Sequence, residues 1–190
     1  MHSMDNYYAG KLLSMIEETQ LHAIANPLIN ITLQGRMDSY PKRRGMTRVK
    51  EMMERGINVA MGHDCVLDPW YAQGSHDMLE VAHMGLHVAQ MTGQEDVHKI
   101  FAAVTTNAAK ILQLQDYGFA PGCYADLVIL QASNPAEALR LRPSRLYVIR
   151  RGEIIARSQP AVSQVNLFSQ TYSVAFRDSE YAPTTDVMLT

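Results

Sequence analysis

The sequence predicts a mixed α/β fold built around parallel strands, followed by a small β element. Two short apolar runs, residues 21–27 and 57–61, lie between segments whose apolar residues recur every three or four positions. The runs show no strict alternation of polar and apolar residues, as expected for strands covered on both faces. In the last third of the chain, β-type runs at 125–130 and 146–156 replace the helical spacing.

The first part of the chain alternates between helix and strand. The Asn26-Pro27 step favours a turn, because a proline disfavours helical torsions in the residue before it. Gly56 and Gly62 mark the ends of a helix and a strand. In order, we expect a helix over 4–20, a strand over 21–27, a loop to Gly45, a helix over 46–55 and a strand over 57–61.

The remainder begins with an irregular segment, 65–71, and becomes helical again. We expect helices over 78–91 and 95–114, separated by Gly93, then a strand over 125–130 and two strands within 146–156 about a turn near Arg151-Gly152. Beyond Pro160 the chain is rich in Ser, Gln and Thr, and we assign it no structure.

Composition and charge exclude several classes of protein. With 47% hydrophobic and 19% charged residues the chain is globular, and its net charge of -2 gives no field that draws nucleic acid or anionic membrane. Cys65 and Cys123 form no disulfide framework or zinc motif, which favours a reducing cytoplasm. No apolar stretch approaches the length of a membrane span.

Asp64 is the residue that points most directly to chemistry. It comes just after the second apolar run, and in parallel α/β folds ligands and catalytic groups gather at the carboxyl ends of the strands. A carboxylate there can bind a metal or accept a proton. The same carboxylate could instead cap the following turn, and the sequence leaves both interpretations open.

Two other clusters favour structural roles. His83 and His87 share one helical face, with His76 upstream, but the glutamate of an HExxH zinc site is missing because Met84 follows His83. We therefore interpret them as core or interface histidines. The basic run Lys42-Arg43-Arg44 is interpreted as a solvated loop rather than a nucleic-acid contact.

Several motifs together resemble bacterial cytosine deaminase of the amidohydrolase superfamily. The resemblance runs from Met1 to about Pro160. The segments that carry it are Ala25-Asn26-Pro27-Leu28-Ile29-Asn30, Leu33-Gln34-Gly35-Arg36, Tyr40-Pro41-Lys42-Arg43-Arg44-Gly45, Gly62-His63-Asp64, Asp68-Pro69-Trp70-Tyr71, Thr105-Thr106-Asn107-Ala108-Ala109-Lys110, Ala125-Asp126-Leu127-Val128-Ile129-Leu130 and Val148-Ile149-Arg150-Arg151-Gly152-Glu153.

The resemblance implies the C-terminal part of a TIM-like (β/α) barrel over 1–115, part of a small β-sandwich domain over 116–160, and a tail over 161–190. It also implies a divalent metal, iron or zinc, that activates the water replacing the exocyclic amine of a nucleobase such as cytosine. Asp64 then ligates the metal and takes the proton from the water, while His63, Cys65 and Trp70 contact the substrate. The Cys65 position is typically a second aspartate in the family, so the sequence leaves open whether the accepted base is cytosine or a related nucleobase with other ring substituents.

The metal-binding HxH, the catalytic glutamate and two further histidines of the family have no counterpart in this sequence. His2 matches a residue beyond one of those positions and does not replace it. We therefore expect activity to need an N-terminal portion as partner, and the isolated chain to self-associate, for example as a homo-oligomer, or to be poorly stable. A chain that is only a remnant should bind no stoichiometric metal. The alternatives are an amidohydrolase for another cyclic amidine or amide, and a non-catalytic remnant acting as a scaffold.

Overall fold

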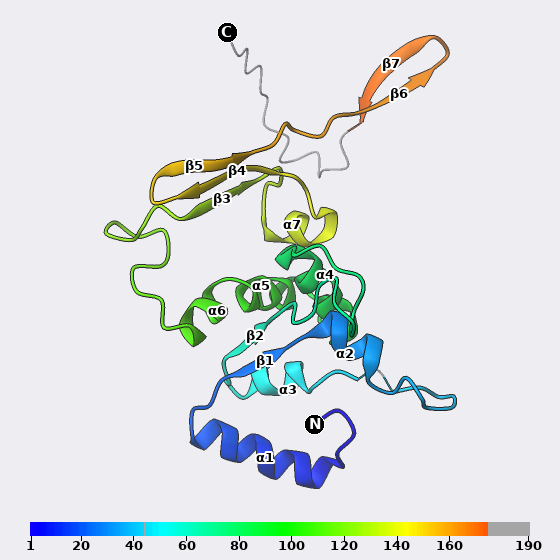
Figure 1. Ribbon diagram of the computed structural model, residues 1–190, viewed down its shortest axis with the longest axis vertical. Helices are drawn as coiled ribbons and strands as arrows, with labels where there is room; N and C mark the ends of the chain where they lie inside the picture. The colour runs from blue at the N-terminus through cyan, green and yellow to red at the C-terminus, as the bar shows by residue number, and fades with distance from the viewer. Residues whose placement is uncertain (44, 175–190) are drawn as a thin grey trace. The chain divides into compact units, whose positions relative to one another are not determined.

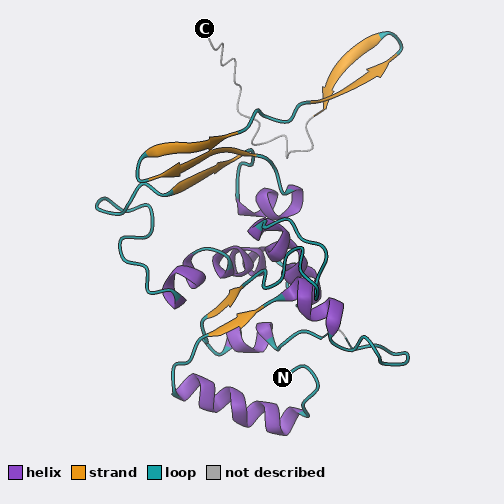
Figure 2. Ribbon diagram, viewed as in Figure 1, coloured by secondary structure: helices purple, strands orange, loops and turns teal. Residues whose placement is uncertain are grey.

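A computed structural model describes residues 1–43 and 45–174 of the protein. The chain divides into two compact units, residues 1–123 and the residues from Tyr124 onward. This division lies slightly after the boundary at 115 that we predicted. Both units mix helices and strands, which confirms the α/β class (Figures 1 and 2). The barrel stays a prediction.

The first unit begins with a helix, as predicted. Asp5 caps α1 by accepting a hydrogen bond from the N–H of Tyr8 at 3.0 Å. The elements of this unit are α1 (Asn6–Glu18), β1 (Ala23–Ala25), α2 (Pro27–Leu33), α3 (Val49–Glu54), β2 (Val59–Met61), α4 (Met78–Val88), α5 (Gln94–Ala103) and α6 (Thr106–Ile111).

The two strands of the first unit are parallel and lie in register, with Ala23 opposite Val59 and Ala25 opposite Met61. Helices α3, α4, α5 and α6 all contact β2, and every residue of β2 is buried. In β1, by contrast, the side chain of Ile24 is 59% exposed. The core therefore lies between β2 and the helices, while β1 forms the less covered side of this small sheet.

The segment after Asn26 differs from the prediction, because it forms helix α2 instead of a loop. Pro27 occupies the first helical position, where its missing N–H costs nothing and its fixed φ suits a helix. From the sequence we predicted only a turn at the Asn26-Pro27 step. A turn and a helix start are both compatible with that step, and the packing of α2 on α4 selects the helix.

The helical region predicted over 95–114 contains two helices and not one. Val104 and Thr105 interrupt it, and Thr105 adopts non-helical torsions of φ -131° and ψ -97°. Thr105 Oγ1 donates to the carbonyl oxygen of Phe101 at 2.9 Å, so its side chain competes with the helical backbone bonds. Two shorter helices, α5 and α6, result and pack against each other.

The second unit contains a three-stranded antiparallel sheet in the order β3-β4-β5 and a separate hairpin of β6 and β7. The turn predicted near Arg151-Gly152 is confirmed, and both residues have positive φ, as a two-residue hairpin turn requires. The elements are β3 (Leu127–Leu130), α7 (Pro135–Leu141), β4 (Arg145–Arg150), β5 (Glu153–Arg157), β6 (Ser163–Leu167) and β7 (Gln170–Val174).

Helix α7 and the final hairpin are elements that we did not predict. Asn134 accepts from the N–H of Glu137 and caps α7, and Glu137 in return accepts from Ser133. The hairpin lies in the segment after Pro160 to which we assigned no structure, and its turn uses Phe168 and Ser169 at positive φ rather than Asn-Gly. The rest of the predicted tail, 175–190, lies outside the described residues.

None of the helices in the described ranges combines the length and the apolar character that crossing a bilayer requires.

Candidate catalytic turn at the carboxyl ends of the strands

A tight turn follows β2 and carries Asp64 at its centre. The N–H of Cys65 donates to the carbonyl oxygen of His63 at 3.0 Å, which closes a three-residue turn. Asp64 has a φ of +67°, in the left-handed region that aspartate tolerates better than most residues. The carboxylate therefore leaves the strand end on a turn of unusual backbone geometry.

The carboxylate of Asp64 is fixed by contacts from both sides of the turn. Its Oδ2 accepts a hydrogen bond at 3.0 Å from Nδ2 of Asn26, the residue directly after β1. Its Oδ1 accepts from the thiol of Cys65, with Sγ at 3.6 Å. The N-cap of the next helix, α4, is Asp77 and not Asp64. The contacts of Asp64 thus join the ends of two strands, and they do not support a capping role.

The Asp64 carboxylate keeps capacity for further ligands. Each carboxylate oxygen offers about two lone-pair positions, and each oxygen of Asp64 uses one of them in the contacts above. The residue is also exposed in this structure. It can accordingly accept a proton or bind a cation while Asn26 holds its orientation.

Cys65 lies between two carboxylates and stays a neutral thiol. The carboxylate of Asp68, partial burial and the carboxylate of Asp64 raise the pKa of Cys65 to about 12. Because metal ligation and nucleophilic attack both need the thiolate, this environment does not suit either role. The side chain is instead a small, uncharged hydrogen-bond donor beside Asp64.

Asp68 organises the loop that carries the predicted aromatic residue. Its Oδ1 accepts from the N–H groups of Tyr71 and Trp70 at 2.8 and 2.9 Å. These bonds, with that of Tyr71 contributing most, lower the pKa of Asp68. The side chain of Trp70 is 71% exposed, and among the described residues no hydrogen bond joins it to Asp64. Its substrate contact stays a prediction.

The ring of His63 is largely buried, and its predicted contact with a substrate stays a prediction. Its side chain is only 9% exposed, and its Nε2 lies 4.0 Å from Oε2 of Glu80 in α4. Nδ1 lies 3.0 Å from the carbonyl oxygen of Cys65. The ring is also 6.4 Å, centroid to centroid, from Tyr71 in the overlying loop. This burial favours a role within the protein rather than the predicted contact with a substrate.

The other histidines form no metal site. His83 and His87 share a face of α4, as predicted, with ring centroids 4.5 Å apart, and Nδ1 of His87 lies 2.7 Å from the carbonyl oxygen of His83. Across residues 1–43 and 45–174, no group of three or more His, Cys, Asp or Glu side chains is placed to hold a metal ion. Asp64 is thus a single candidate ligand in the described part of the chain.

The basic run makes contacts within the fold, and Nη1 of Arg43 also donates to Oγ of Ser3 at 2.8 Å. Arg43 pairs with Asp38 through two hydrogen bonds, which lower the pKa of that carboxyl, and Lys42 donates to the carbonyl oxygen of Arg36 at 3.0 Å. Arg44 lies outside the described residues. These contacts are those of the solvated loop that we predicted.

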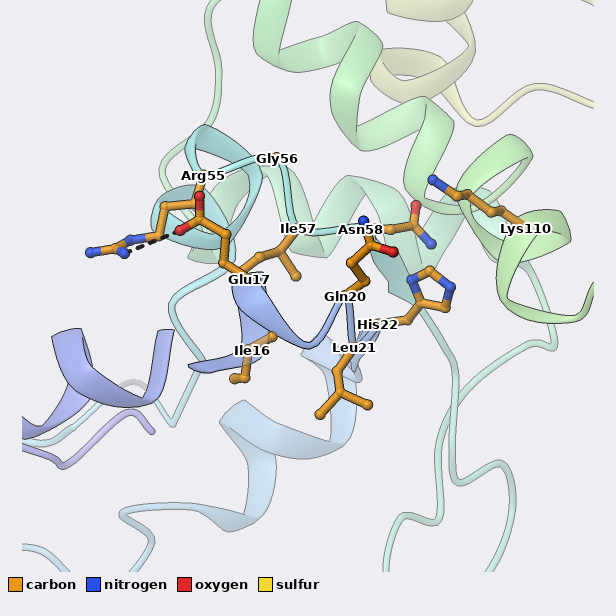
Figure 3. A pocket seen from close by; sticks show the side chains of 10 residues that line it. All are labelled: Ile16, Glu17, Gln20, Leu21, His22, Arg55, Gly56, Ile57, Asn58 and Lys110. Atoms are coloured by element: carbon orange, nitrogen blue, oxygen red, sulfur yellow. Dashed lines mark hydrogen bonds and ion pairs between the residues drawn. The ribbon is translucent and has the colours of Figure 1, made fainter. Parts of the chain in front are cut away.

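A cavity of about 500 Å³ lies at the opposite, amino ends of β1 and β2 (Figure 3). Residues 20–22 before β1 and 55–58 before β2 line it, with Lys110 from α6. Arg55 contacts Glu17 at 3.5 Å, the pair joined by the dashed line in the figure. In parallel α/β folds ligands bind at the carboxyl ends of the strands, so we do not assign the reaction to this cavity.

Asn26 belongs to the site, although we did not predict this from the sequence. It appeared there only as part of a turn, but it makes no capping bond to α2 and instead donates to Asp64. A polar residue directly after a buried strand was the available signal. The parallel pairing of β1 with β2 brings the two strand ends together. That pairing could not be predicted from the sequence.

Comparisons with known proteins found several similar sequences and structures. A family model described as "Amidohydrolase family" matches residues 2–162. A solved structure of 5-methylcytosine deaminase from Klebsiella pneumoniae, liganded with 5-fluorocytosine, is similar to this chain with a TM-score of 0.82 and 41% identity, covering 85% of this chain and 39% of the other.

Two curated relatives are also similar. Pterin deaminase from Rhizobium rhizogenes (strain K84) is 32% identical over 158 residues, which are 82% of this chain and 36% of the relative. N-isopropylammelide isopropyl amidohydrolase from Pseudomonas sp. (strain ADP) is 30% identical over 116 residues, which are 60% of this chain and 29% of the relative. The matched segments therefore span only 29–36% of the length of these two curated relatives.

Proposed function

The chain belongs to the amidohydrolase family, and from that premise we propose that it carries the catalytic carboxylate, Asp64, of a hydrolytic nucleobase deaminase. In this reaction water adds to the ring carbon that bears the exocyclic amine. The carbon–nitrogen bond then breaks, ammonia leaves, and the carbon becomes a carbonyl. The observation that carries the proposal is the Asp64 carboxylate held by Asn26 where the ends of β1 and β2 meet.

Asp64 takes the proton from the attacking water in this proposal. A general base must lie within hydrogen-bond reach of the proton that it accepts, with its own orientation fixed. The bond from Asn26 occupies one lone-pair position of Oδ2 and leaves others facing outward. The thiol of Cys65 adds a second, neutral donor without placing another negative charge beside the base.

The described residues do not fit a complete metal site by themselves. A catalytic zinc site of the usual kind takes three protein ligands, and among the described residues no three His, Cys, Asp or Glu side chains are grouped to hold a metal ion. We therefore derive no step through a metal. The predicted iron or zinc would need its other ligands from residues beyond those described, either of the same protein or of a partner chain.

The exposure of β1 supports such a partner. The side chain of Ile24 is 59% exposed, and among the described residues β1 pairs with β2 alone. An uncovered strand edge with an apolar side chain is a surface that another strand normally covers. We propose that further strands of a barrel pair with β1 and complete the site around Asp64.

Cytosine substituted at position 5 is the substrate class that we favour. The similar structure from Klebsiella is a 5-methylcytosine deaminase, at 41% identity. Cys65 supports the same class, because a small neutral side chain beside Asp64 leaves more room for an apolar substituent than an aspartate would. The similarity to pterin deaminase favours a second candidate, deamination of another amino-heterocycle.

The test is an assay of ammonia release. The 190-residue chain is assayed alone and after co-expression with the part of the Klebsiella 5-methylcytosine deaminase that it does not match. Substrates are 5-methylcytosine, cytosine, isoguanine, creatinine and pterin. We expect turnover only in the co-expressed sample, with 5-methylcytosine preferred over cytosine. Turnover of pterin alone would favour the second candidate, and no turnover of any substrate by a folded complex would leave the scaffold alternative.

A further inference from the structure

The turn that carries Asp64 needs something to hold it. A three-residue turn closed from Cys65 N–H to the carbonyl oxygen of His63, with a central φ of +67°, has the features of the classic γ-turn, which is rare and strained. Strained backbone persists only where the surrounding structure fixes it, and such positions cluster at functional sites. A single backbone hydrogen bond is little to offset that strain.

The imidazole of His63 supplies a second bond across the same turn. Nδ1 lies 3.0 Å from the carbonyl oxygen of Cys65. Because a carbonyl oxygen only accepts, Nδ1 carries the proton and donates it. His63 and Cys65 are therefore joined twice, once through the backbone and once through the side chain, with Asp64 between them.

The surroundings of the ring fix it in that position. It is 9% exposed, and a Cβ added to Gly74 would come within 2.5 Å of its Cε1, so the overlying loop lies directly against the ring. Nε2 is buried without a hydrogen-bond partner in the described part of the chain, 4.0 Å from Glu80. An apolar side chain would fill this space without burying an unpaired nitrogen, so packing alone does not account for a histidine.

We propose that His63 is a positioning residue, which aims the Asp64 carboxylate by clamping its turn and does not touch the substrate. This revises the substrate contact that we predicted for His63. The hydrogen bond from His63 to the carbonyl oxygen of Cys65 holds the turn in place. The hydrogen bond from Asn26, next to the other strand, then orients the Asp64 carboxylate. The kinetic part of the proposal rests on the proposed function, whereas the structural part does not.

The structural part is tested by amide hydrogen exchange, measured by NMR on the 190-residue chain. In H63L the imidazole donor is lost and the Cys65 amide should exchange about tenfold faster, the effect of losing one net hydrogen bond. In H63N the side-chain nitrogen can take the place of Nδ1, and exchange should stay within about threefold of the parent, the usual uncertainty in such magnitudes. H63Q moves the donor toward the position of Nε2 and should resemble H63L.

The matched control is H87L, which removes another histidine whose Nδ1 bonds a backbone carbonyl, that of His83. It should leave the Cys65 amide unchanged. Equal exchange in H63L and the parent would overturn the proposal. The proposal would also be overturned if H63N exchanged as fast as H63L and H63Q, or if all three variants failed to fold. In either case the role of His63 would be burial of the ring and not donation to Cys65.

The kinetic part uses whichever preparation shows deaminase turnover. H63L should lower kcat roughly a hundredfold, the cost of misplacing a catalytic group by about an ångström, with KM nearly unchanged, and H63N should recover most of kcat. In a D64N background H63L should have no further effect on kcat, because His63 acts through Asp64. Additive losses would overturn this part. Absence of turnover in the parent would refute the proposed function and leave the exchange result to stand.

Discussion

The two ends of the short parallel sheet differ in what they offer a ligand. The amino end has the cavity of about 500 Å³, with Arg55 already paired to Glu17 on its wall. The carboxyl end has a carboxylate on a strained turn, oriented by an amide from the neighbouring strand. The difference teaches that convergence of polar groups from two strands is a better guide to chemistry than volume. Polar groups on the wall of the amino-end cavity are used within the fold, since Arg55 pairs with Glu17 and Nδ2 of Asn58 donates to the carbonyl oxygen of Asn107 at 3.2 Å.

Among the substitutions that compare the two ends of the sheet, D64N should have the largest effect on activity. It keeps the shape of the side chain and the tolerance of asparagine for a positive φ, but removes the group that accepts the proton. We expect kcat for ammonia release to fall by roughly 10² to 10⁴, measured on the preparation that shows turnover. Activity within a factor of about two of the parent would remove Asp64 from the mechanism.

The substitution G74A should destabilise the loop over His63. Gly74 has a φ of +95°, and an added Cβ would meet the ring of His63 at 2.5 Å. Backbone strain of this kind costs about 1–3 kcal/mol, measured as the change in free energy of unfolding in urea.

The matched control for that loop is G122A, since Gly122 has a φ of +97° and nothing within 4 Å of an added Cβ. G74A should cost more than G122A, because only G74A meets the histidine. Equal costs would show that the loop does not depend on the ring beneath it.

Alkylation of the two cysteines tests the environment of Asp64 without any assay of activity. Because the pKa of Cys65 is raised to about 12, above the usual value of about 8.5, little thiolate forms at pH 8.5, and the fraction grows only as the pH rises toward 12. Iodoacetamide should modify Cys65 about tenfold more slowly than Cys123 at that pH, as followed by mass spectrometry. Faster modification of Cys65 would mean that the carboxylates of Asp68 and Asp64 do not face its thiol.

The substitution R55Q at the amino end should have the smallest effect. The ion pair with Glu17 is long, at 3.5 Å, and both side chains are substantially exposed, so its loss should change the free energy of unfolding by less than about 1 kcal/mol. Ammonia release should be unchanged. A large loss of kcat in R55Q would mean that the amino-end cavity takes part in the reaction.

Several elements were predictable because their signals are local. The apolar spacing of α1, the Gly56 and Gly62 boundaries of the second strand and the Arg151-Gly152 turn all depend on residues close together in the sequence. The missed elements had ambiguous local signals. Pro27 is compatible with either a turn or the first residue of a helix, and Phe168-Ser169 is an unusual pair for a hairpin turn.

The candidate site was also predictable only where its signals are local in the sequence. The sequence by itself determined that a carboxylate ends an apolar strand at Asp64, and the family resemblance indicated the kind of reaction. Only the tertiary structure decided that Asn26 holds that carboxylate and that the ring of His63 is nearly buried, 4.0 Å from Glu80. The physical reason is that strand pairing and loop packing join residues far apart in the chain, and local patterns of residues do not encode which distant groups will meet.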